Sequence, residues 1–400
     1  MKKQLLATTA LAAAGMFAVS GAAMAQASKP TLSLGGWMEG IVSAADTDEN
    51  QADQATVGVI FDSEIHINGS ATLDNGIRIT GRVELEGQSG GRDIAGGASR
   101  NTIDEAWLSV NGSFGQVIIG GTDNAAFQEV TRYSGSWATQ VGQNAALDAG
   151  DFAPTRGLTT FQRETQTRLS LGDGDSEKIN YFTPRIAGFR LGASYMPSFA
   201  EGTPDTDSGG LANAGPNGTS AQRHGFTDEA EHEGYALSAS FDQKFGGVGV
   251  GLAAGYASVH RTAGAGFVEE SNPEGYSFAG SLSFGGFEVA AGYRNESNRK
   301  TANAAARIRN AEVFDAGAKY TFGANHISAG YIRGQSEDSA AVSGTDDTTV
   351  NVVSYRRDLG PGVQYRLNLW RIDYDGEGEG AAGTDDAETF AVSTSVRLAF

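Results

Sequence analysis

The feature that most constrains this chain is a period-two alternation of apolar and polar side chains, which recurs from residue 31 to residue 400. Between residues 274 and 284, for example, Tyr276, Phe278 and Leu282 share one face, whereas serine and alanine occupy the other. Successive side chains of a β-strand point to opposite faces of a sheet, so each such segment predicts a strand with one apolar and one polar face. No stretch after residue 26 keeps a helical period beyond two turns. The predicted fold class is therefore all-β.

The alternating segments predict sixteen strands, joined by connections that are alternately short and long. The strands are expected at residues 31–45, 55–72, 76–88, 102–112, 115–121, 166–184, 188–198, 232–245, 248–261, 274–284, 287–297, 309–322, 325–337, 348–359, 363–375 and 386–400. The long connections are rich in Gly, Asp, Asn and Ser, the residue types that turns and loops require. Short turns at one end and long loops at the other predict an up-and-down antiparallel barrel.

Phenylalanine residues beside the short turns place this barrel in a membrane. Phe114, Phe245, Phe284, Phe287 and Phe322 all flank such a turn. Aromatic rings prefer the polar edge of a bilayer, and an even number of strands with aromatic girdles is typical of outer-membrane barrels. Within lipid the sheet has to close, because an open edge would leave backbone groups unpaired. The alternative is a soluble sandwich or propeller, which explains neither the one-sided loop lengths nor these aromatic residues.

The first 25 residues predict a cleaved signal peptide. Lys2 and Lys3 precede an apolar run from Leu5 to Val19, and Ala23-Met24-Ala25 is a small-x-small cleavage site. We therefore expect residues 26–400 to form a transmembrane β-barrel that crosses the outer membrane of a Gram-negative cell many times. No later segment has eighteen consecutive apolar residues, so no transmembrane helix is expected.

Composition excludes several classes of function. The chain has no cysteine, which excludes a disulfide scaffold, a thiolate metal site and cysteine catalysis. Its 29 lysines and arginines against 48 aspartates and glutamates give a net charge of −19, which would repel nucleic acid. An outer-membrane hydrolase would need a serine beside a base, but the period-two neighbours of His66 are Glu64 and Asn68, so we expect no enzymatic activity and no catalytic residue.

A group of local motifs resembles a known family. Asp104-Glu105-Ala106-Trp107 is followed by Phe114-Gly115 and Ile118-Ile119-Gly120-Gly121, and Phe400 ends the alternating last strand. In these features the chain resembles the general-diffusion porins of Gram-negative outer membranes, in particular the alpha-proteobacterial, Rhodobacter-like porins. The resemblance implies a 16-stranded barrel with a long third loop folded into the pore, a homotrimer, and contact with outer-membrane lipid and lipopolysaccharide. The function it implies is a water-filled channel for passive diffusion of small hydrophilic solutes and ions.

The longest connection, residues 122–165, is expected to be that constriction loop, because its five aromatic residues provide apolar surface for packing. A flap outside the barrel is the alternative. We predict that its carboxylates face cations of the pore wall, with Arg82 the first choice and Arg78 the next. These carboxylates are Asp123, Glu129, Asp148 and Asp151. Opposite charges across a narrow aqueous gap produce a transverse field that orients polar solutes.

Strand geometry predicts which other residues line the pore. A strand rises about 3.3 Å per residue and tilts by about 35–45°, so the middle of the apolar band lies about five or six residues from a short turn. Inward positions near that depth are Glu39, Glu64, His66, Arg82, Glu84, Glu105, Lys178, Arg294 and Arg366. For each of them, a solvated side chain with no role in selection is the alternative interpretation. Because acids outnumber the nearby bases, we predict mild cation selectivity.

No cofactor and no protein metal site are expected from the sequence. His224 and His232 share a loop with acidic residues, but a hydrated acidic loop is the simpler interpretation. Acidic loops offer carboxylate oxygens to Ca²⁺, so loop-bound Ca²⁺ that bridges to lipopolysaccharide is kept as an alternative. Two other functions also stay open: a substrate-selective outer-membrane channel and a structural or adhesive barrel.

Overall fold

The computed structural model describes residues 29–47, 57–87, 103–144, 149–152, 165–169, 171, 175–198, 231–261, 272–298, 309–337, 344–376 and 386–400. The predicted signal peptide, residues 1–25, lies outside this part of the chain. Within it, sixteen strands form one sheet. Their bounds are β1 Thr31–Thr47, β2 Val57–Thr72, β3 Arg78–Glu86, β4 Ile103–Gly112, β5 Gly115–Gly121, β6 Glu177–Phe182, β7 Phe189–Ser198, β8 Glu231–Phe245, β9 Val248–Arg261, β10 Glu274–Phe284, β11 Phe287–Asn298, β12 Arg309–Phe322, β13 Asn325–Glu337, β14 Asp346–Gly360, β15 Val363–Asp375 and β16 Asp386–Ala399.

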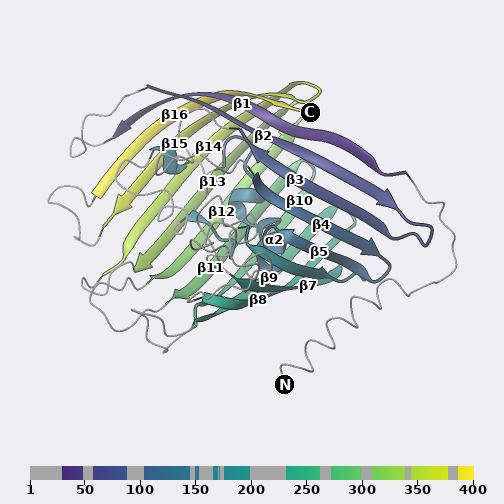
Figure 1. Cartoon of the computed structure of the whole chain (residues 1–400). Coiled ribbons are helices and arrows are strands. Elements are labelled where there is room, and N and C mark those ends of the chain that lie inside the picture. Colours follow the sequence, from purple (N-terminus) through teal and green to yellow (C-terminus); the bar gives the residue numbers. More distant parts are fainter. Residues whose placement is uncertain are drawn as a thin grey trace, which may run out of the picture.

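The sheet is a closed antiparallel barrel. Each strand pairs with its neighbours in the sequence, and β1 also pairs with β16, from Trp37 opposite Ala399 to Thr47 opposite Thr389. Figure 1 shows the strands arranged as a tilted ring. Closure pairs the backbone of every strand with two neighbours, as a sheet surrounded by lipid requires. The sequence-based prediction of a 16-stranded up-and-down barrel is confirmed.

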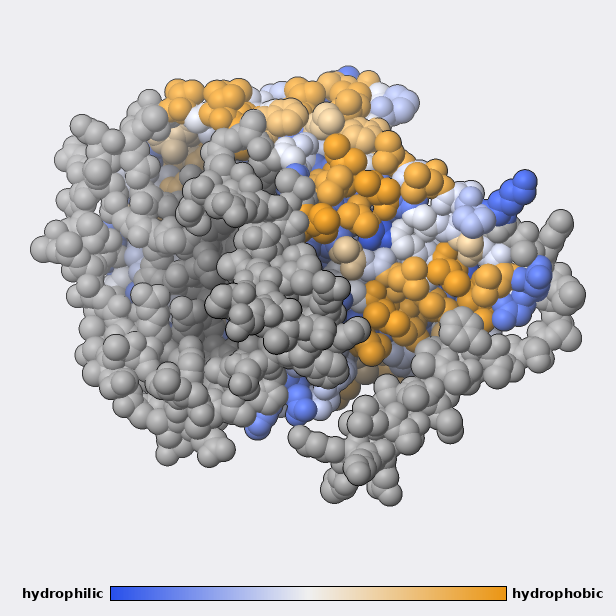
Figure 2. Space-filling model, in the orientation of Figure 1, coloured by the Kyte–Doolittle hydropathy of each residue, from blue (hydrophilic) through white to orange (hydrophobic). Residues whose placement is uncertain are grey.

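The outer face of the barrel is apolar and the inner face is polar. On β10, Phe278 and Leu282 leave 51% and 45% of their surface exposed, whereas Ser277, the residue before Phe278, is fully buried. Figure 2 shows a broad hydrophobic surface that extends over several strands. An apolar surface of this extent is unfavourable in water and favourable in a lipid bilayer.

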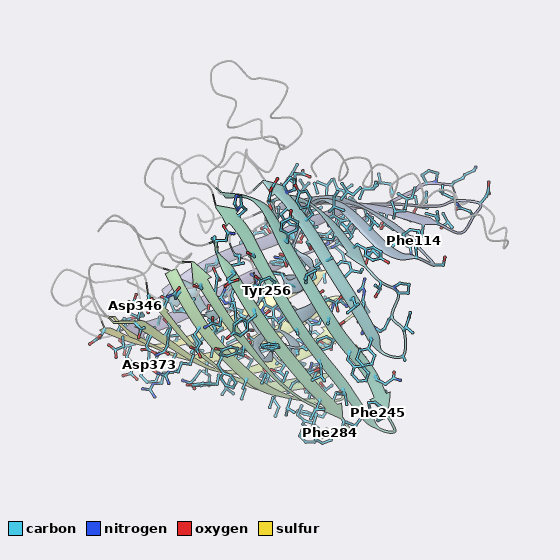
Figure 3. The ribbon with its side chains drawn as sticks, turned by 90° about the horizontal axis from the view of Figure 1, so that it is seen from below. Phe114, Phe245, Tyr256, Phe284, Asp346 and Asp373 are labelled. Carbon is cyan, nitrogen blue, oxygen red and sulfur yellow. The ribbon has the colours of Figure 1, made fainter. Side chains whose placement is uncertain are left out.

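The two rims of the barrel carry different side chains. At the short turns, Phe245, Phe284 and Phe287 are each about half exposed, and the rings of the last two stack with centroids 5.7 Å apart. Figure 3 shows Phe245 and Phe284 at one end of the barrel and Asp346 and Asp373 at the other. The aromatic rim suits the polar edge of a bilayer, and the opposite rim leads into the long loops.

One strand is shorter than the sequence predicts. The alternation of residues 166–184 predicts a long strand, but β6 comprises only Glu177–Phe182. Before it, Thr167 and Leu169 are fully buried. Thr167 Oγ1 donates a hydrogen bond to Asp315, and the backbone oxygen of Leu169 accepts one from Asn124. These residues alternate because they pack between the barrel wall and the segment that follows β5, and not because they pair in the sheet.

Between β5 and β6, the described residues include two short helices and a 3₁₀ turn. They are α2 (Ala125–Thr131), α3 (Gly135–Ala138) and η1 (Ala149–Phe152). α2 contacts β6 to β10, α3 contacts β10 to β13, and η1 contacts β15. Figure 1 shows α2 surrounded by strands. None of the helices in the described part of the chain is long and apolar enough to cross a membrane.

Candidate functional site: the inner wall and the segment after β5

Small residues on the inner wall make room for the two helices. A Cβ atom at Gly251 of β9 would lie 2.2 Å from Cδ1 of Tyr133, which follows α2. A Cβ atom at Gly135, the first residue of α3, would lie 2.7 Å from the backbone Cα of Ala316 on β12. Helix and wall therefore approach more closely than any residue with a Cβ atom would allow.

Asp315 of β12 anchors α3 to the wall. Its carboxylate is fully buried and accepts hydrogen bonds at 2.9 Å from the backbone N–H groups of Gly135 and Ser136. The hydroxyls of Ser136 and Thr167 also donate to it. The N-cap residue of α3, Ser134, makes no capping hydrogen bond with its side chain. A wall carboxylate thus satisfies the unpaired donors at this helix start and complements the positive end of the helix.

Asn124 anchors the start of α2 in a similar way. Its side-chain oxygen accepts a hydrogen bond of 3.0 Å from Phe127 N, and its amide donates to Leu169 O at 3.0 Å. Next to it, Ala125 N donates to Ser194 Oγ on β7 at 2.7 Å. The N-cap therefore joins three segments that are far apart in the sequence.

The segment is tied to the last strands as well. Asn368 of β15 accepts a hydrogen bond of 3.1 Å from Gln143 N, and Ser393 of β16 donates to the Gln143 side chain. In η1, the ring of Phe152 packs on Trp370, with centroids 5.7 Å apart. Contacts of the segment after β5 are thus found along the wall from β6 to β16. The charged inner faces of β1 to β4 form the remaining part of the wall, which we call the complementary arc.

Glu129 of α2 is fully buried among arginines. Its Oε1 atom lies 3.1 Å from Arg190 of β7 and 3.8 Å from Arg132, and its Oε2 atom lies 3.7 Å from Arg185. Arg190 also donates to Gln116 of β5 at 2.9 Å. Three guanidinium groups thus surround one loop carboxylate, and the local charge is positive.

These arginines are not the wall cations that the sequence predicts. Arg82 lies 2.7 Å from Glu84 on its own strand and donates to Asn68 at 3.0 Å, and Arg78 is exposed at the start of β3. Both belong to β3, whereas α2 packs on β6 to β10. The expected pairing of Glu129 with Arg82 or Arg78 is therefore replaced by pairing with Arg185 and Arg190.

Asp123, another predicted loop carboxylate, joins an acidic cluster. Its carboxylate and those of Glu105 and Asp175 have oxygens within 4.8 Å of one another. Burial, followed by the charges of neighbouring carboxylates, raises the pKa of Asp175 to about 9. Asp148 lies outside the described residues, and so does the side chain of Asp151.

The inner faces of β2 to β4 carry most of the predicted acidic wall residues. His66 contacts Glu64, and its Nε2 atom lies 3.8 Å from Glu84 Oε1. On β4, Glu105 accepts a hydrogen bond of 3.0 Å from Trp107 Nε1. The structure therefore brings Glu64, His66 and Glu84 together and sets Glu105 on the adjacent strand.

Glu39 of β1 joins a second cluster with the arginines of the last strands. Its Oε2 atom lies 3.2 Å from Arg366 and 3.5 Å from Arg397, and Ser395 donates to its other oxygen. The guanidinium of Arg397 also lies 4.0 Å from the centroid of a Trp37 ring. Here Arg366 of β15 and Arg397 of β16 share the carboxylate of Glu39 on β1, at the point where the barrel closes.

Lys178 and Arg294 are covered by the segment after β5, although the sequence predicts them to line the pore. Each leaves only 2% of its surface exposed. The Lys178 ammonium donates to the backbone oxygen of Thr122. Arg294 lies 3.3 Å from Glu296 and donates to the backbone oxygen of Arg168 at 3.5 Å. Both cations hold the backbone of the covering segment.

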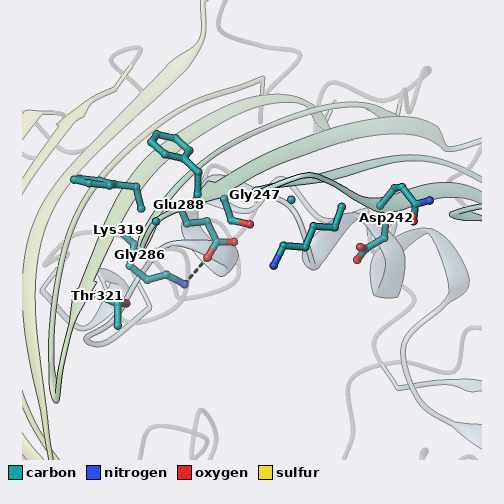
Figure 4. Close-up of a pocket in the computed structure, with 13 residues that line it drawn as sticks. Asp242, Gly247, Gly286, Glu288, Lys319 and Thr321 are labelled. Carbon is teal, nitrogen blue, oxygen red and sulfur yellow. Dashed lines mark ion pairs between the residues drawn. The ribbon is translucent and has the colours of Figure 1, made fainter.

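A pocket of about 530 Å³ lies at the short-turn end of β8 to β12. Figure 4 shows its charged lining, in which Lys319 lies 2.7 Å from Glu288. Lys319 also donates to the backbone oxygen of Ala138 in α3 at 2.9 Å, and Lys244 and Asp242 complete the charged lining. Alternating charges of this kind favour a hydrated entrance over a tight ligand site.

The strand arithmetic missed Arg185, Arg190 and Asp315. Arg185 lies in the turn between β6 and β7, and Arg190 is the second residue of β7. Both are therefore closer to the short turn than the five or six residues at which the estimate places the middle of the apolar band. Asp315 is an inward carboxylate whose next inward neighbour is Gly317. A charge beside a glycine on an inner face is the signal that could have indicated a docking point for another segment.

The chain was compared with known families and structures. A family model described as Gram-negative porin matches residues 7–377, and no curated protein matches the chain. The anion-selective porin from Comamonas acidovorans is 15% identical, with a TM-score of 0.59, and the match covers 93% of this chain and 100% of that one. A loop L8 deletion mutant of OmpT, an outer membrane protein of Vibrio cholerae, is 13% identical, with a TM-score of 0.57 and coverage of 93% and 99%.

A mutant of the Rh. blastica porin is 14% identical, with a TM-score of 0.51 and coverage of 92% of this chain and 100% of that one. At these identities the solved structures show a shared fold. The family match spans most of the sequence and agrees with the closed barrel and its apolar outer face. The chain therefore belongs to the Gram-negative porin family and is an outer-membrane β-barrel channel protein.

Proposed function

We propose that the protein forms a water-filled pore through which small hydrophilic solutes and ions diffuse passively across the outer membrane. The observation that carries the proposal is a closed barrel whose outer face is apolar and whose inner face is lined by charged side chains. Charged groups inside a lipid-embedded barrel need water or counter-charges, and a polar lumen of this kind is typical of porins. Passive diffusion needs no catalytic residue, so no enzymatic activity is assigned.

In this proposal the pore is narrowest where the described part of the segment after β5, residues 122–144 and 149–152, packs on the inner wall. On the side of the segment, three arginines surround the single carboxylate of Glu129. On the complementary arc, Glu64, Glu84 and Glu105 are accompanied by Arg82. The transverse field would then be positive at the segment and negative at the wall, opposite in sign to the field that the sequence predicts. Polar solutes would orient in it, and apolar ones would have to displace ordered water.

Mild cation selectivity is part of the same proposal. It is supported by the net charge of −19 and by the carboxylates of β1 to β4. The arginines beside Glu129 and Glu39 oppose this preference and would keep it weak. The Comamonas porin is described as anion-selective, but at 15% identity its likeness concerns the fold alone.

Single-channel recording of the purified protein in a planar bilayer tests the proposal. We expect stepwise conductance increments and, in a KCl gradient, a reversal potential of cationic sign. An anionic sign would refute the selectivity, and a bilayer without steps would refute the pore in favour of a structural or adhesive barrel. Current that one solute blocks saturably at low concentration would favour a substrate-selective channel.

Finer assignments are proposed with the pore. A homotrimer, an alpha-proteobacterial type of porin and contact with lipopolysaccharide rest on the resemblance, which the motif Asp104–Trp107 supports. Cleavage after Ala25 rests on the signal-peptide pattern, and loop-bound Ca²⁺ rests on the carboxylates of the acidic loops. Chemical crosslinking, N-terminal sequencing of the mature protein, and the effect of EDTA on lipopolysaccharide binding would test the trimer, the cleavage and the Ca²⁺ in turn.

A further inference from the structure

A histidine and two glutamates meet on the inner wall of β2 and β3. Glu64 and His66 are two residues apart on β2, so their side chains share the inner face, and Glu84 is directly opposite His66 on β3. One ligand atom from each residue lies within 4.8 Å of the other two, and His66 Nε2 is 3.8 Å from Glu84 Oε1. The sheet register alone therefore brings one imidazole and two carboxylates to a single point.

The chemistry of these three groups favours a transition-metal ion over a hard cation. Zinc binds imidazole nitrogen and carboxylate oxygen at about 2.0–2.2 Å, so tetrahedral ligand atoms lie roughly 3.4 Å apart. The separation of 3.8 Å between His66 and Glu84 is close to that value. Calcium and magnesium prefer oxygen ligands alone and gain little from an imidazole.

Hydrogen bonds from neighbouring side chains orient both carboxylates. Trp37 Nε1 donates to Glu64 Oε2 at 3.1 Å, which leaves Oε1 directed at His66. Arg82, itself held by Asn68 at 3.0 Å, donates at 2.7 Å to Glu84 Oε1, the same oxygen that lies 3.8 Å from His66 Nε2. Outer hydrogen bonds of this kind fix metal ligands in position and tune their affinity.

Charge and access also suit a bound cation. The two carboxylates exceed the single charge of Arg82, and Glu105 on the next strand adds another negative charge. The side chains of His66 and Glu64 leave 19% and 17% of their surface exposed. An ion can therefore reach the cluster from the lumen and keep a water molecule as its remaining ligand.

We propose that Glu64, His66 and Glu84 form a binding site for a divalent transition-metal ion such as Zn²⁺ on the inner wall of the barrel. Binding itself does not depend on the proposed pore. An effect on current does, because an ion held on this wall changes the charge of the lumen only if the lumen conducts.

Calorimetric titration of detergent-solubilised protein without a histidine tag tests the binding, with ZnCl₂ as the probe. We expect one Zn²⁺ per chain to be lost, or its affinity to fall at least tenfold, in both His66→Gln and Glu84→Gln. His326→Gln is the matched control, because His326 is a mostly buried histidine on the inner face of β13 that bonds to Thr321 and Asp358. It should leave this binding unchanged.

Unchanged Zn²⁺ binding in a folded His66→Gln protein would overturn the proposal. So would equal binding of Ca²⁺ and Zn²⁺, because an acidic cluster without the imidazole would then explain the data. If Zn²⁺ binds in a His66-dependent manner but the bilayer shows no current at all, the metal site stands and the pore fails. If current flows without such binding, the metal site fails and the pore stands.

Discussion

Replacing Asp315 by alanine should release α3 from the barrel wall. The buried carboxylate takes two backbone hydrogen bonds of 2.9 Å, from Gly135 and Ser136, and two more from hydroxyl groups. Each buried N–H group left without an acceptor costs about 1–3 kcal/mol, and loss of an N-cap costs about 0.5–2 kcal/mol. Because these figures describe some of the same bonds, we expect a total of about 3–5 kcal/mol.

Amide hydrogen exchange measures this cost directly, because local opening exposes the backbone of residues 134–139. A penalty of 3–5 kcal/mol corresponds to exchange about 10²–10⁴ times faster in this peptide. Asp373→Ala is the matched control, since Asp373 pairs with the half-exposed Arg371 at 3.1 Å, and such a surface pair contributes about 0–1 kcal/mol. Unchanged protection of residues 134–139 in Asp315→Ala would refute the view that this carboxylate anchors the segment.

Three further changes test other parts of the molecule. Burial and neighbouring carboxylates raise the pKa of Asp175 to about 9. The protonated side chain therefore stabilises the folded protein fully below the unfolded pKa of about 4, and this stabilisation is lost as the pH rises toward 9. Asp175→Asn should reduce the fall in melting temperature between pH 5 and pH 9, measured by the heat-dependent shift of the folded band in gel electrophoresis. Glu129→Gln removes the carboxylate that lies 3.1 Å from Arg190 and should shift the reversal potential toward anions; a shift toward cations would contradict the proposed field. Gly36→Ala places a Cβ atom 2.1 Å from Glu64 O at a φ of +136°, so it should lower the melting temperature. Gly40→Ala is the control, because a Cβ atom there has nothing within 4 Å and should leave the melting temperature unchanged. Equal effects of the two changes would contradict this account.

Most of the barrel could be predicted because each strand carries its own signal. The sequence predicts strands at 287–297 and 363–375, and the structure has Phe287–Asn298 and Val363–Asp375. A side chain that faces lipid has to be apolar whichever strand lies beside it, so the alternation is readable one strand at a time. Short glycine turns then fix the neighbours, and closure of the sheet follows from the need to pair both edges.

The partners of the segment after β5 could not be predicted in the same way. Whether Glu129 pairs with Arg82 or with Arg190 depends on the path of the chain across the wall. The local periodicity of the sequence contains no information about that path. The alternation at Thr167 and Leu169 misled for a related reason, because packing between two layers also buries alternate side chains. Burial pattern alone does not distinguish a strand of the sheet from a chain pressed against it.

The size of the inward side chains nevertheless marks where the segment packs. A barrel of sixteen strands is too wide for its own wall side chains to fill, so part of its lumen is available to a folded-in segment. On β9, the inward Gly251 and Gly255 admit the ring of Tyr133 and the methyl group of Ala126. On β2 and β3 the inward positions carry glutamate, histidine and arginine, which bond to one another. The segment therefore packs where inward glycines let it approach the wall, and in the proposed pore the charged arc of β2 and β3 is the part of the wall that faces the solutes.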